Sequence, residues 1–193
     1  MADEATKRPA LRRALEKLAR AVLDLVREGL PAPVVVGGAA VSLATGGAVA
    51  TGDIDLVYSN DRALARALSA AGFKPEDRVG HLTRGFYDPE TAIGVEAVGT
   101  RLFDGRAEEG RCIAITAVGG GLLRIPAIED LVVDRASQFD SGTAPLMLEQ
   151  VRALLEANPD LDDAYLARRL TEETGGRATL PGLRKLIAGM NKA

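Results

Sequence analysis

The sequence predicts an α/β core followed by a helical region, and three observations support this fold class. Residues 11–30 have apolar side chains at helical spacing and lead into three consecutive valines at 34–36. Short apolar runs of strand length, separated by glycines, continue as far as residue 125. Beyond Pro126 nearly every segment has the periodicity of a helix. We therefore expect an α/β core with its N-terminal helix at 1–126 and a C-terminal helical subdomain at 127–193.

The first elements follow from apolar spacing and from helix-breaking residues. The predicted helix at 11–30 carries one apolar face, made of Leu11, Leu15, Leu18, Val22, Leu25 and Val26. Pro31 and Pro33 end it, because proline does not continue a helix, and the valine strand follows. Gly37-Gly38 then predict a tight turn into a short helix of small residues.

The later elements are shorter, and turn residues mark their ends. Asn60 or Asp61 is a candidate N-cap for a helix that ends near Gly72. Gly119 to Gly121 predict the loop of a terminal hairpin. The expected strands lie at 53–56, at 73, at 82–87, at 91–98, at 112–117 and at 122–125, and the late helices at 128–138, 144–157, 162–174 and 181–190.

Asp53 and Asp55 are the first candidate functional residues. Side chains alternate between the two faces of a strand, so these carboxylates share one face, while Ile54 and Leu56 point to the other. Two adjacent carboxylates repel each other, and a divalent cation relieves that repulsion. Mg²⁺ often takes one or two carboxylates together with substrate phosphates. The alternative interpretation is a solvated strand end that binds no ligand.

Glu96 is a candidate third carboxylate on a neighbouring strand. In the run at 91–98, Ile93, Val95 and Ala97 are expected to face the core, and Glu96 projects from the opposite face. The alternative is a solvent-facing residue without a function.

The order of these motifs resembles a known enzyme signature. An apolar strand, Gly37-Gly38, a short helix and the run at 51–56, Thr-Gly-Asp-Ile-Asp-Leu, follow one another. This order resembles the polymerase-beta-like nucleotidyltransferase superfamily, and within it the small bacterial nucleotidyltransferases of abortive-infection and toxin–antitoxin systems. The resemblance covers about residues 34–157. It implies a mixed sheet flanked by helices, with a C-terminal helical region.

The resemblance also implies roles for individual residues. Asp53 and Asp55 would hold two Mg²⁺ or Mn²⁺ ions, and Glu96 would complete the ion that activates the incoming hydroxyl. Gly37 and Gly38 would let the backbone approach the triphosphate of an NTP. Arg135 matches a basic residue that contacts the nucleotide phosphates in relatives. Its alternative is a surface arginine paired with Asp134 or with the acidic residues 129–130.

Three functions remain open. The first is transfer of a nucleoside monophosphate from an NTP to a hydroxyl of RNA such as tRNA, of a protein or of a small molecule. The second is the same activity in the toxin of a toxin–antitoxin pair, with an antitoxin protein as partner. The third is a catalytically silent relative that binds a nucleotide or a partner protein. The third stays open because Ala39 stands where many relatives have serine, and residues 48–50 and 141–143 lack the basic residues often found there.

Composition excludes several other classes. The chain has 193 residues and a formal net charge of −3, which argues against broad electrostatic binding of nucleic acid. The single Cys112 excludes an internal disulfide, and one cysteine with one histidine makes a zinc cluster implausible. Residues 30–52 are uncharged, but their prolines and glycine pairs exclude a membrane helix. The N-terminus lacks the apolar core of a signal peptide, so we expect a cytoplasmic protein.

Overall fold

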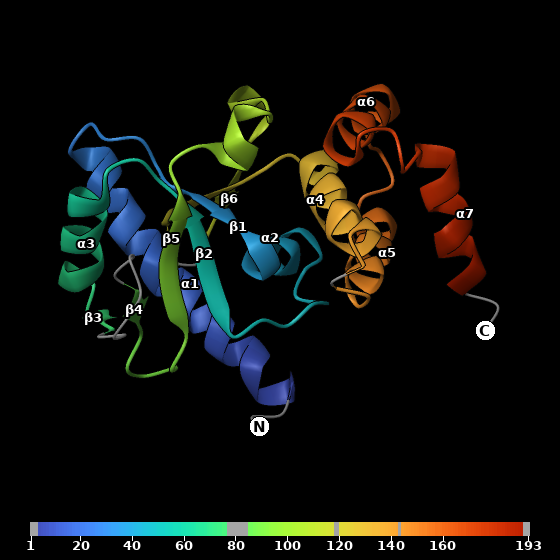
Figure 1. Cartoon of the computed structure of the whole chain (residues 1–193). Helices are drawn as coiled ribbons and strands as arrows, with labels where there is room; N and C mark the ends of the chain where they lie inside the picture. The colour runs from blue at the N-terminus through green and yellow to red at the C-terminus, as the bar shows by residue number, and fades with distance from the viewer. Residues whose placement is uncertain (1–3, 77–84, 118–119, 143, 191–193) are drawn as a thin grey trace. The chain divides into compact units, whose positions relative to one another are not determined.

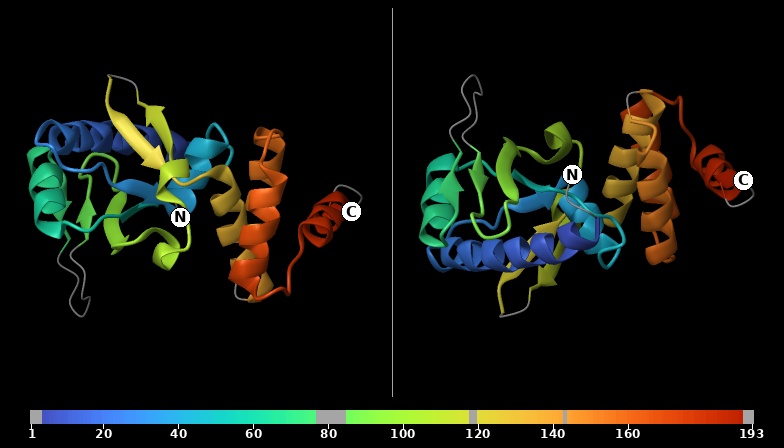
Figure 2. Two further views of the ribbon diagram at one scale, coloured as in Figure 1. Left: turned by 90° about the horizontal axis from the view of Figure 1, so that it is seen from above. Right: turned by 90° about the horizontal axis from the view of Figure 1, so that it is seen from below.

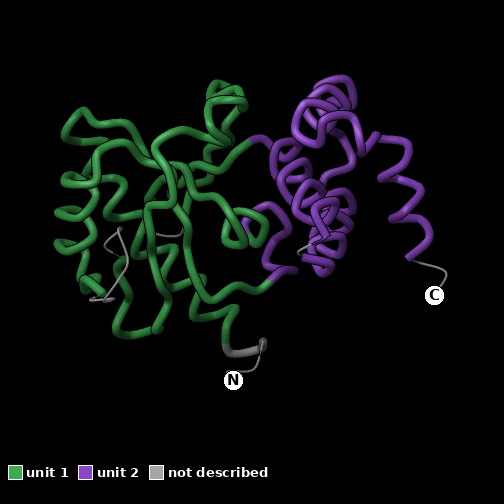
Figure 3. Tube along the Cα trace, viewed as in Figure 1, with its two compact units in different colours: residues 1–42, 50–126 green, residues 43–49, 127–193 purple. Residues whose placement is uncertain are grey.

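A computed structural model describes residues 4–76, 85–117, 120–142 and 144–190 of the chain (Figure 1). The chain divides into two compact units (Figure 3). The first consists of residues 1–42 and 50–126, and the second of residues 43–49 and 127–193. Within the described ranges, no helix is both long and apolar enough to cross a membrane.

The first unit contains the strands and the N-terminal helices. Its strands are β1 (Val34–Val36), β2 (Asp53–Val57), β3 (Lys74–Pro75), β4 (Phe86–Tyr87), β5 (Gly94–Gly99), β6 (Ile113–Thr116) and β7 (Leu122–Ile125). Its helices are α1 (Glu4–Arg27), most of α2 (Gly37–Ala44), α3 (Asp61–Ala70) and the 3₁₀ turns η1 (Leu102–Gly105) and η2 (Glu109–Arg111).

The strands of the described residues form one mixed sheet in the order β3-β4-β5-β2-β1-β7-β6. β2 pairs in parallel with β5, and β1 in parallel with β7, whereas β1 and β2 are antiparallel. The pairs β3–β4, β4–β5 and β6–β7 are also antiparallel. The predicted α/β fold with a mixed sheet and flanking helices is therefore confirmed.

Helix α1 packs against the sheet with the predicted apolar face, except for Val26, which is 40% exposed (Figure 2). Leu18 and Leu25 are fully buried, as are Leu123 and Ile125 of β7. At Gly121 the approach is so close that a Cβ would lie 2.6 Å from the Cβ of Ala19. A glycine before β7 is therefore needed for the hairpin to pack on α1.

An ion pair joins α1 to the turn after β4. Lys17 Nζ donates to Asp88 Oδ1 at 2.6 Å and to the Gly72 carbonyl at 3.3 Å. The Asp88 side chain is 2% exposed, and Thr91 Oγ1 donates to its Oδ2 at 2.6 Å. Burial raises the pKa of Asp88. The hydrogen bonds and the Lys17 charge together lower it by more, so the pKa lies below its ordinary value.

Several boundaries differ from the predicted ones for local reasons. Helix α1 begins at Glu4, earlier than predicted, and it continues through Pro9, which lies inside the helix and cannot donate a backbone hydrogen bond there. Strand β5 begins at Gly94 rather than 91, because Ala92 takes a left-handed φ of 57° in a turn held by Asp88. The predicted strand at 82–87 appears as β4, and its residues 82–84 lie outside the described residues. Asn60 is the N-cap of α3, as predicted.

The second unit is helical, as predicted, and α4 contacts both α5 and α6 (Figure 2). Its helices are α4 (Ile128–Asp140), α5 (Met147–Ala157), α6 (Asp163–Thr174) and α7 (Leu180–Met190). The segment at 43–49 belongs to this unit, and Asn158 Nδ2 donates to the Ala44 carbonyl at 3.2 Å.

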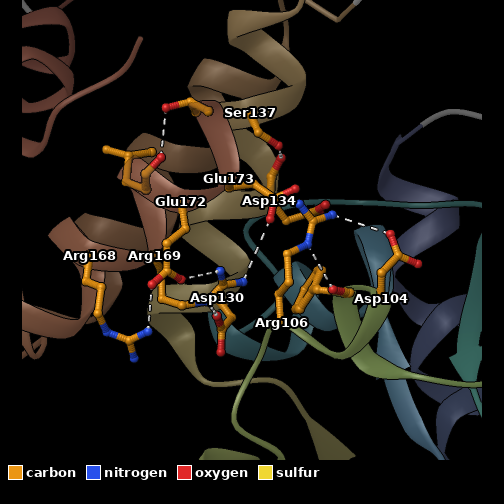
Figure 4. Close-up of polar contacts among 12 residues, drawn as sticks. Asp104, Arg106, Asp130, Asp134, Ser137, Arg168, Arg169, Glu172 and Glu173 are labelled. Carbon is orange, nitrogen blue, oxygen red and sulfur yellow. Dashed lines mark hydrogen bonds and ion pairs between the residues drawn. The ribbon is translucent and has the colours of Figure 1, made fainter. Parts of the chain in front are cut away.

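A buried polar cluster joins α4 to α6 (Figure 4). Arg169 Nε donates to Asp130 Oδ1 at 2.9 Å, and the Tyr165 hydroxyl donates to Asp130 Oδ2 at 2.9 Å. The side chains of Arg169 and Asp130 are each 1% exposed. Each charge is therefore compensated inside the helical unit, as burial requires.

Candidate functional site

The carboxylates of β2 are on the face opposite the core. Ile54 and Leu56 are fully buried, whereas Asp53 is exposed and Asp55 is half-buried. This alternation agrees with the prediction from the sequence. Asp53 and Asp55 therefore share one face of the sheet.

Glu96 lies beside Asp55 in the sheet. β2 and β5 are parallel, and their register pairs Asp55 with Glu96 and Asp53 with Gly94. Register partners point to the same face, and neighbouring strands lie about 4.8 Å apart. The three candidate carboxylates thus occupy one face of two adjacent strands. On the other face Ile93 and Val95 are buried as expected, and Ala97 is only half-buried.

Gly37 brings the backbone at the start of α2 against Asp55. β1 pairs Val36 with Asp55, and the next residue, Gly37, turns the chain into α2 with a φ of +65°. A Cβ on Gly37 would lie 2.3 Å from Asp55 Oδ2. Both the left-handed φ and this contact require a glycine.

Thr51 contacts both motifs. Its Oγ1 donates to Asp53 Oδ1 at 2.7 Å. A Cβ on Gly38 would lie 2.9 Å from the same Oγ1. The sequence does not predict this contact. Its only signal is a short hydroxyl side chain two residues before Asp53.

The donor set fits a divalent cation that is shared with a substrate. Asp53 and Asp55 offer hard carboxylate oxygens, and the space that a Cβ would fill at Gly37 holds the Asp55 carboxylate. Across the ranges that the structure describes, no three His, Cys, Asp or Glu side chains are grouped so as to hold a metal ion. An aspartate pair could hold such an ion together with phosphate oxygens, an arrangement that Mg²⁺ often takes.

A strained segment covers part of the same face and was not predicted. Leu102 of η1 is 2% exposed and packs against Val34 and Val36, next to the register position of Asp55. Phe103 and Asp104 have left-handed φ values of 46° and 55°, which are costly for residues with a Cβ. The dipeptide Asp-Gly at 104–105 is a turn signal that would have indicated this bend.

Arg135 lies in the other unit, on α4. Its side chain is 9% exposed and donates to Asp134 Oδ2 from Nε at 2.9 Å and from Nη2 at 2.5 Å. Nη1 also lies 3.4 Å from the sulfur of Met147. Arg135 is therefore paired with Asp134, as the alternative interpretation expects. Its contact with nucleotide phosphates stays a prediction.

Comparisons with known proteins bear on the fold. No protein-family model matches the chain, and no curated protein matches it in sequence. Among solved structures, an antigenic nucleotidyltransferase-like protein from Paracoccidioides brasiliensis is similar, with a TM-score of 0.61, 16% identity and 93% of each chain covered.

Two further structures are similar at the same level. ANT(2'')-Ia in complex with adenylyl-2''-tobramycin has a TM-score of 0.54 and 16% identity over 83% of this chain and 97% of that one. JHP933 from Helicobacter pylori has a TM-score of 0.54 and 18% identity over 89% of this chain and 75% of that one. At such identities the likeness concerns the fold, and it shows that the chain has the fold of nucleotidyltransferase-like proteins, as the sequence predicts.

Proposed function

We propose that the chain is a metal-dependent nucleotidyltransferase that transfers a nucleoside monophosphate from an NTP to a hydroxyl group. The observation that supports this proposal is that Asp53, Asp55 and Glu96 share one face of β2 and β5, with Asp55 against Gly37. The nucleotidyltransferase-like fold supports the same enzyme class.

In the proposed reaction the acceptor hydroxyl loses its proton to solvent and its oxygen attacks the α-phosphorus. The bond between the α-phosphorus and the oxygen shared with the β-phosphate breaks, and pyrophosphate leaves with that oxygen. Asp53 and Asp55 would hold Mg²⁺ or Mn²⁺, with Glu96 as the third carboxylate. The bound ion supplies positive charge that offsets the charge developing on the phosphate oxygens. Backbone N–H groups at Gly37 and Gly38, at the start of α2, would donate to the triphosphate.

The acceptor belongs to one of three classes: RNA such as tRNA, protein or a small molecule. The adenylyl-2''-tobramycin in the ANT(2'')-Ia structure supports a small-molecule acceptor. The test is incubation of the full chain with each α-labelled NTP, Mg²⁺ and total RNA, cell extract or tobramycin, followed by identification of the labelled species. If no NTP labels any acceptor, including the protein itself, the transferase proposal is contradicted.

Nucleotide binding without transfer is the second candidate function. The observations that favour it are Ala39, which stands where many relatives have serine, and the pairing of Arg135 with Asp134. Metal-dependent NTP binding by the wild type, without labelling of any acceptor, would identify the chain as a binder of nucleotide. Loss of that binding in a D53N/D55N double variant would locate the nucleotide at β2.

The toxin role has a separate test. If the chain is the toxin of a toxin–antitoxin pair, its expression in the absence of an antitoxin should stop growth of the host cell. The D53N/D55N variant should allow growth, because it retains the fold and loses the metal ligands. Equal growth arrest by both proteins would contradict a toxin that acts through nucleotidyl transfer.

A further inference from the structure

Thr51 holds the exposed carboxylate of the aspartate pair. Asp53 is at the start of β2 and is exposed to solvent, where a carboxylate samples several rotamers. The hydrogen bond from Thr51 Oγ1 to Asp53 Oδ1, at 2.7 Å, restricts that freedom. Thr51 is β-branched, and its own χ1 torsion is therefore stiff.

Gly38 leaves the space that the Thr51 side chain occupies. The backbone of Gly38 is outside the left-handed region, so its conformation does not by itself require a glycine. A Cβ at this position would lie 2.9 Å from Thr51 Oγ1 and 3.0 Å from Thr51 Cβ. The close contact with Thr51 therefore explains why position 38 is a glycine.

We propose that Thr51 is a positioning residue for Asp53, and that Gly38 is needed because any side chain there displaces Thr51. The inference rests on the proposed function, since it assigns Thr51 an effect on the metal and nucleotide site. Each glycine of the pair then serves one carboxylate. Gly37 makes room for Asp55 directly, and Gly38 makes room for the threonine that orients Asp53.

The consequence concerns metal affinity. A carboxylate ligand that is oriented by a neighbouring hydrogen bond binds its ion more tightly, and loss of such a neighbour typically costs about 10–100-fold in affinity. Thr51→Val keeps the shape of the side chain and removes the hydroxyl. Thr51→Ser keeps the hydroxyl and removes only the methyl group. The pair of variants therefore separates the hydrogen bond from the packing.

The experiment measures Mn²⁺ binding to the full chain by electron paramagnetic resonance of the free ion, with a non-hydrolysable NTP analogue present. We expect Thr51→Val to weaken Mn²⁺ binding about tenfold and Thr51→Ser to stay close to wild type. Gly38→Ala should weaken binding by a similar factor. The double variant G38A/T51V should be no weaker than either single variant, because both changes remove the same interaction. Thr116→Val, at an exposed position on β6, is the matched control.

The outcomes separate this inference from the proposed function. If the wild type binds Mn²⁺ with the analogue and T51V binds equally well, the positioning role is overturned while the proposed function stands. If Thr51→Ser binds Mn²⁺ as weakly as Thr51→Val, the positioning role is also overturned, because the hydroxyl is then not what determines the affinity. A wild-type chain without metal-dependent binding of the analogue would overturn the proposed function, and this inference with it.

Discussion

Gly37 is the residue with the most severe steric constraint at the candidate site. Alanine at this position would place a Cβ 2.3 Å from Asp55 Oδ2 and would keep an unfavourable φ of +65°. We predict that Gly37→Ala lowers the free energy of unfolding by at least about 1–2 kcal/mol, the cost of a left-handed residue with a Cβ. It should also abolish metal-dependent NTP binding, because Asp55 has to move. Urea denaturation and nucleotide titration measure the two effects.

Gly46 offers a matched control for that substitution. It has a similar φ of +61°, and a Cβ there would meet no atom within 4 Å in the described part of the chain. Gly46→Ala should therefore lose a similar amount of stability and retain NTP binding. Equal NTP affinity in both variants would show that Asp55 does not depend on the space at Gly37.

Glu96 is assigned to the candidate site by its register with Asp55. If it completes the site, Glu96→Gln should leave NTP binding largely intact and lower turnover about 10²–10³-fold, the usual cost of one lost transition-state interaction. If it is a solvent-facing strand residue, the change should stay within about 0.5 kcal/mol of neutral in stability and be silent in catalysis. Steady-state kinetics at saturating Mg²⁺ separate these results.

At the level of elements, the ion pair between Lys17 of α1 and Asp88 after β4 is buried and therefore sensitive to substitution. Lys17→Met would keep the apolar stem and leave a carboxylate that is 2% exposed without its cation. Removing one partner of a buried pair typically costs about 3–5 kcal/mol. We predict a loss of this size at neutral pH, measured by urea denaturation, and Lys7→Met at an exposed position of α1 should be nearly neutral.

The same pair predicts a pH dependence. The pKa of Asp88 is below its ordinary value in the folded chain, so the ionised group stabilises the fold above the unfolded value of about 3.9. That contribution is lost as the pH falls through the lower folded pKa. The stability difference between wild type and Lys17→Met should therefore be largest near neutral pH and shrink below about pH 4. A difference that does not change with pH would contradict the assigned role of Asp88.

The elements that the sequence predicts well are those with a clear apolar pattern. The order β1, Gly37-Gly38, α2 and β2 follows from the valine run, the glycine pair and the Asp-Ile-Asp-Leu alternation. The η1 segment was missed because it has neither helical nor strand periodicity, and tertiary packing of Leu102 on Val34 and Val36 fixes it. The Thr51 contact was missed because it depends on how closely α2 approaches the segment before β2, which periodicity does not specify.

At the scale of the whole molecule, the candidate residues divide between two units. The carboxylates and the glycine pair are in the first unit, and Arg135 is in the second. The sequence leaves two partners open for Arg135, a nucleotide phosphate by resemblance and Asp134 by proximity, and order along the chain does not choose between them. In the structure Arg135 pairs with the adjacent Asp134. The shared face of Asp53 and Asp55 follows from the alternation of side chains along a strand. No such periodicity predicts which basic side chain would meet the nucleotide phosphates.

Two compact units need not unfold together, and the buried pair Arg169–Asp130 tests this. Arg169→Met leaves Asp130 buried without its cation, so the helical unit should lose about 3–5 kcal/mol. Hydrogen exchange read by mass spectrometry should show lost protection in α4 and α6 and unchanged protection in β2 and β5. A D130L/R169M double variant should recover much of the stability, because apolar replacement of a whole buried pair is often neutral. Equal loss of protection in the sheet and the helices would mean that the chain unfolds as one cooperative body.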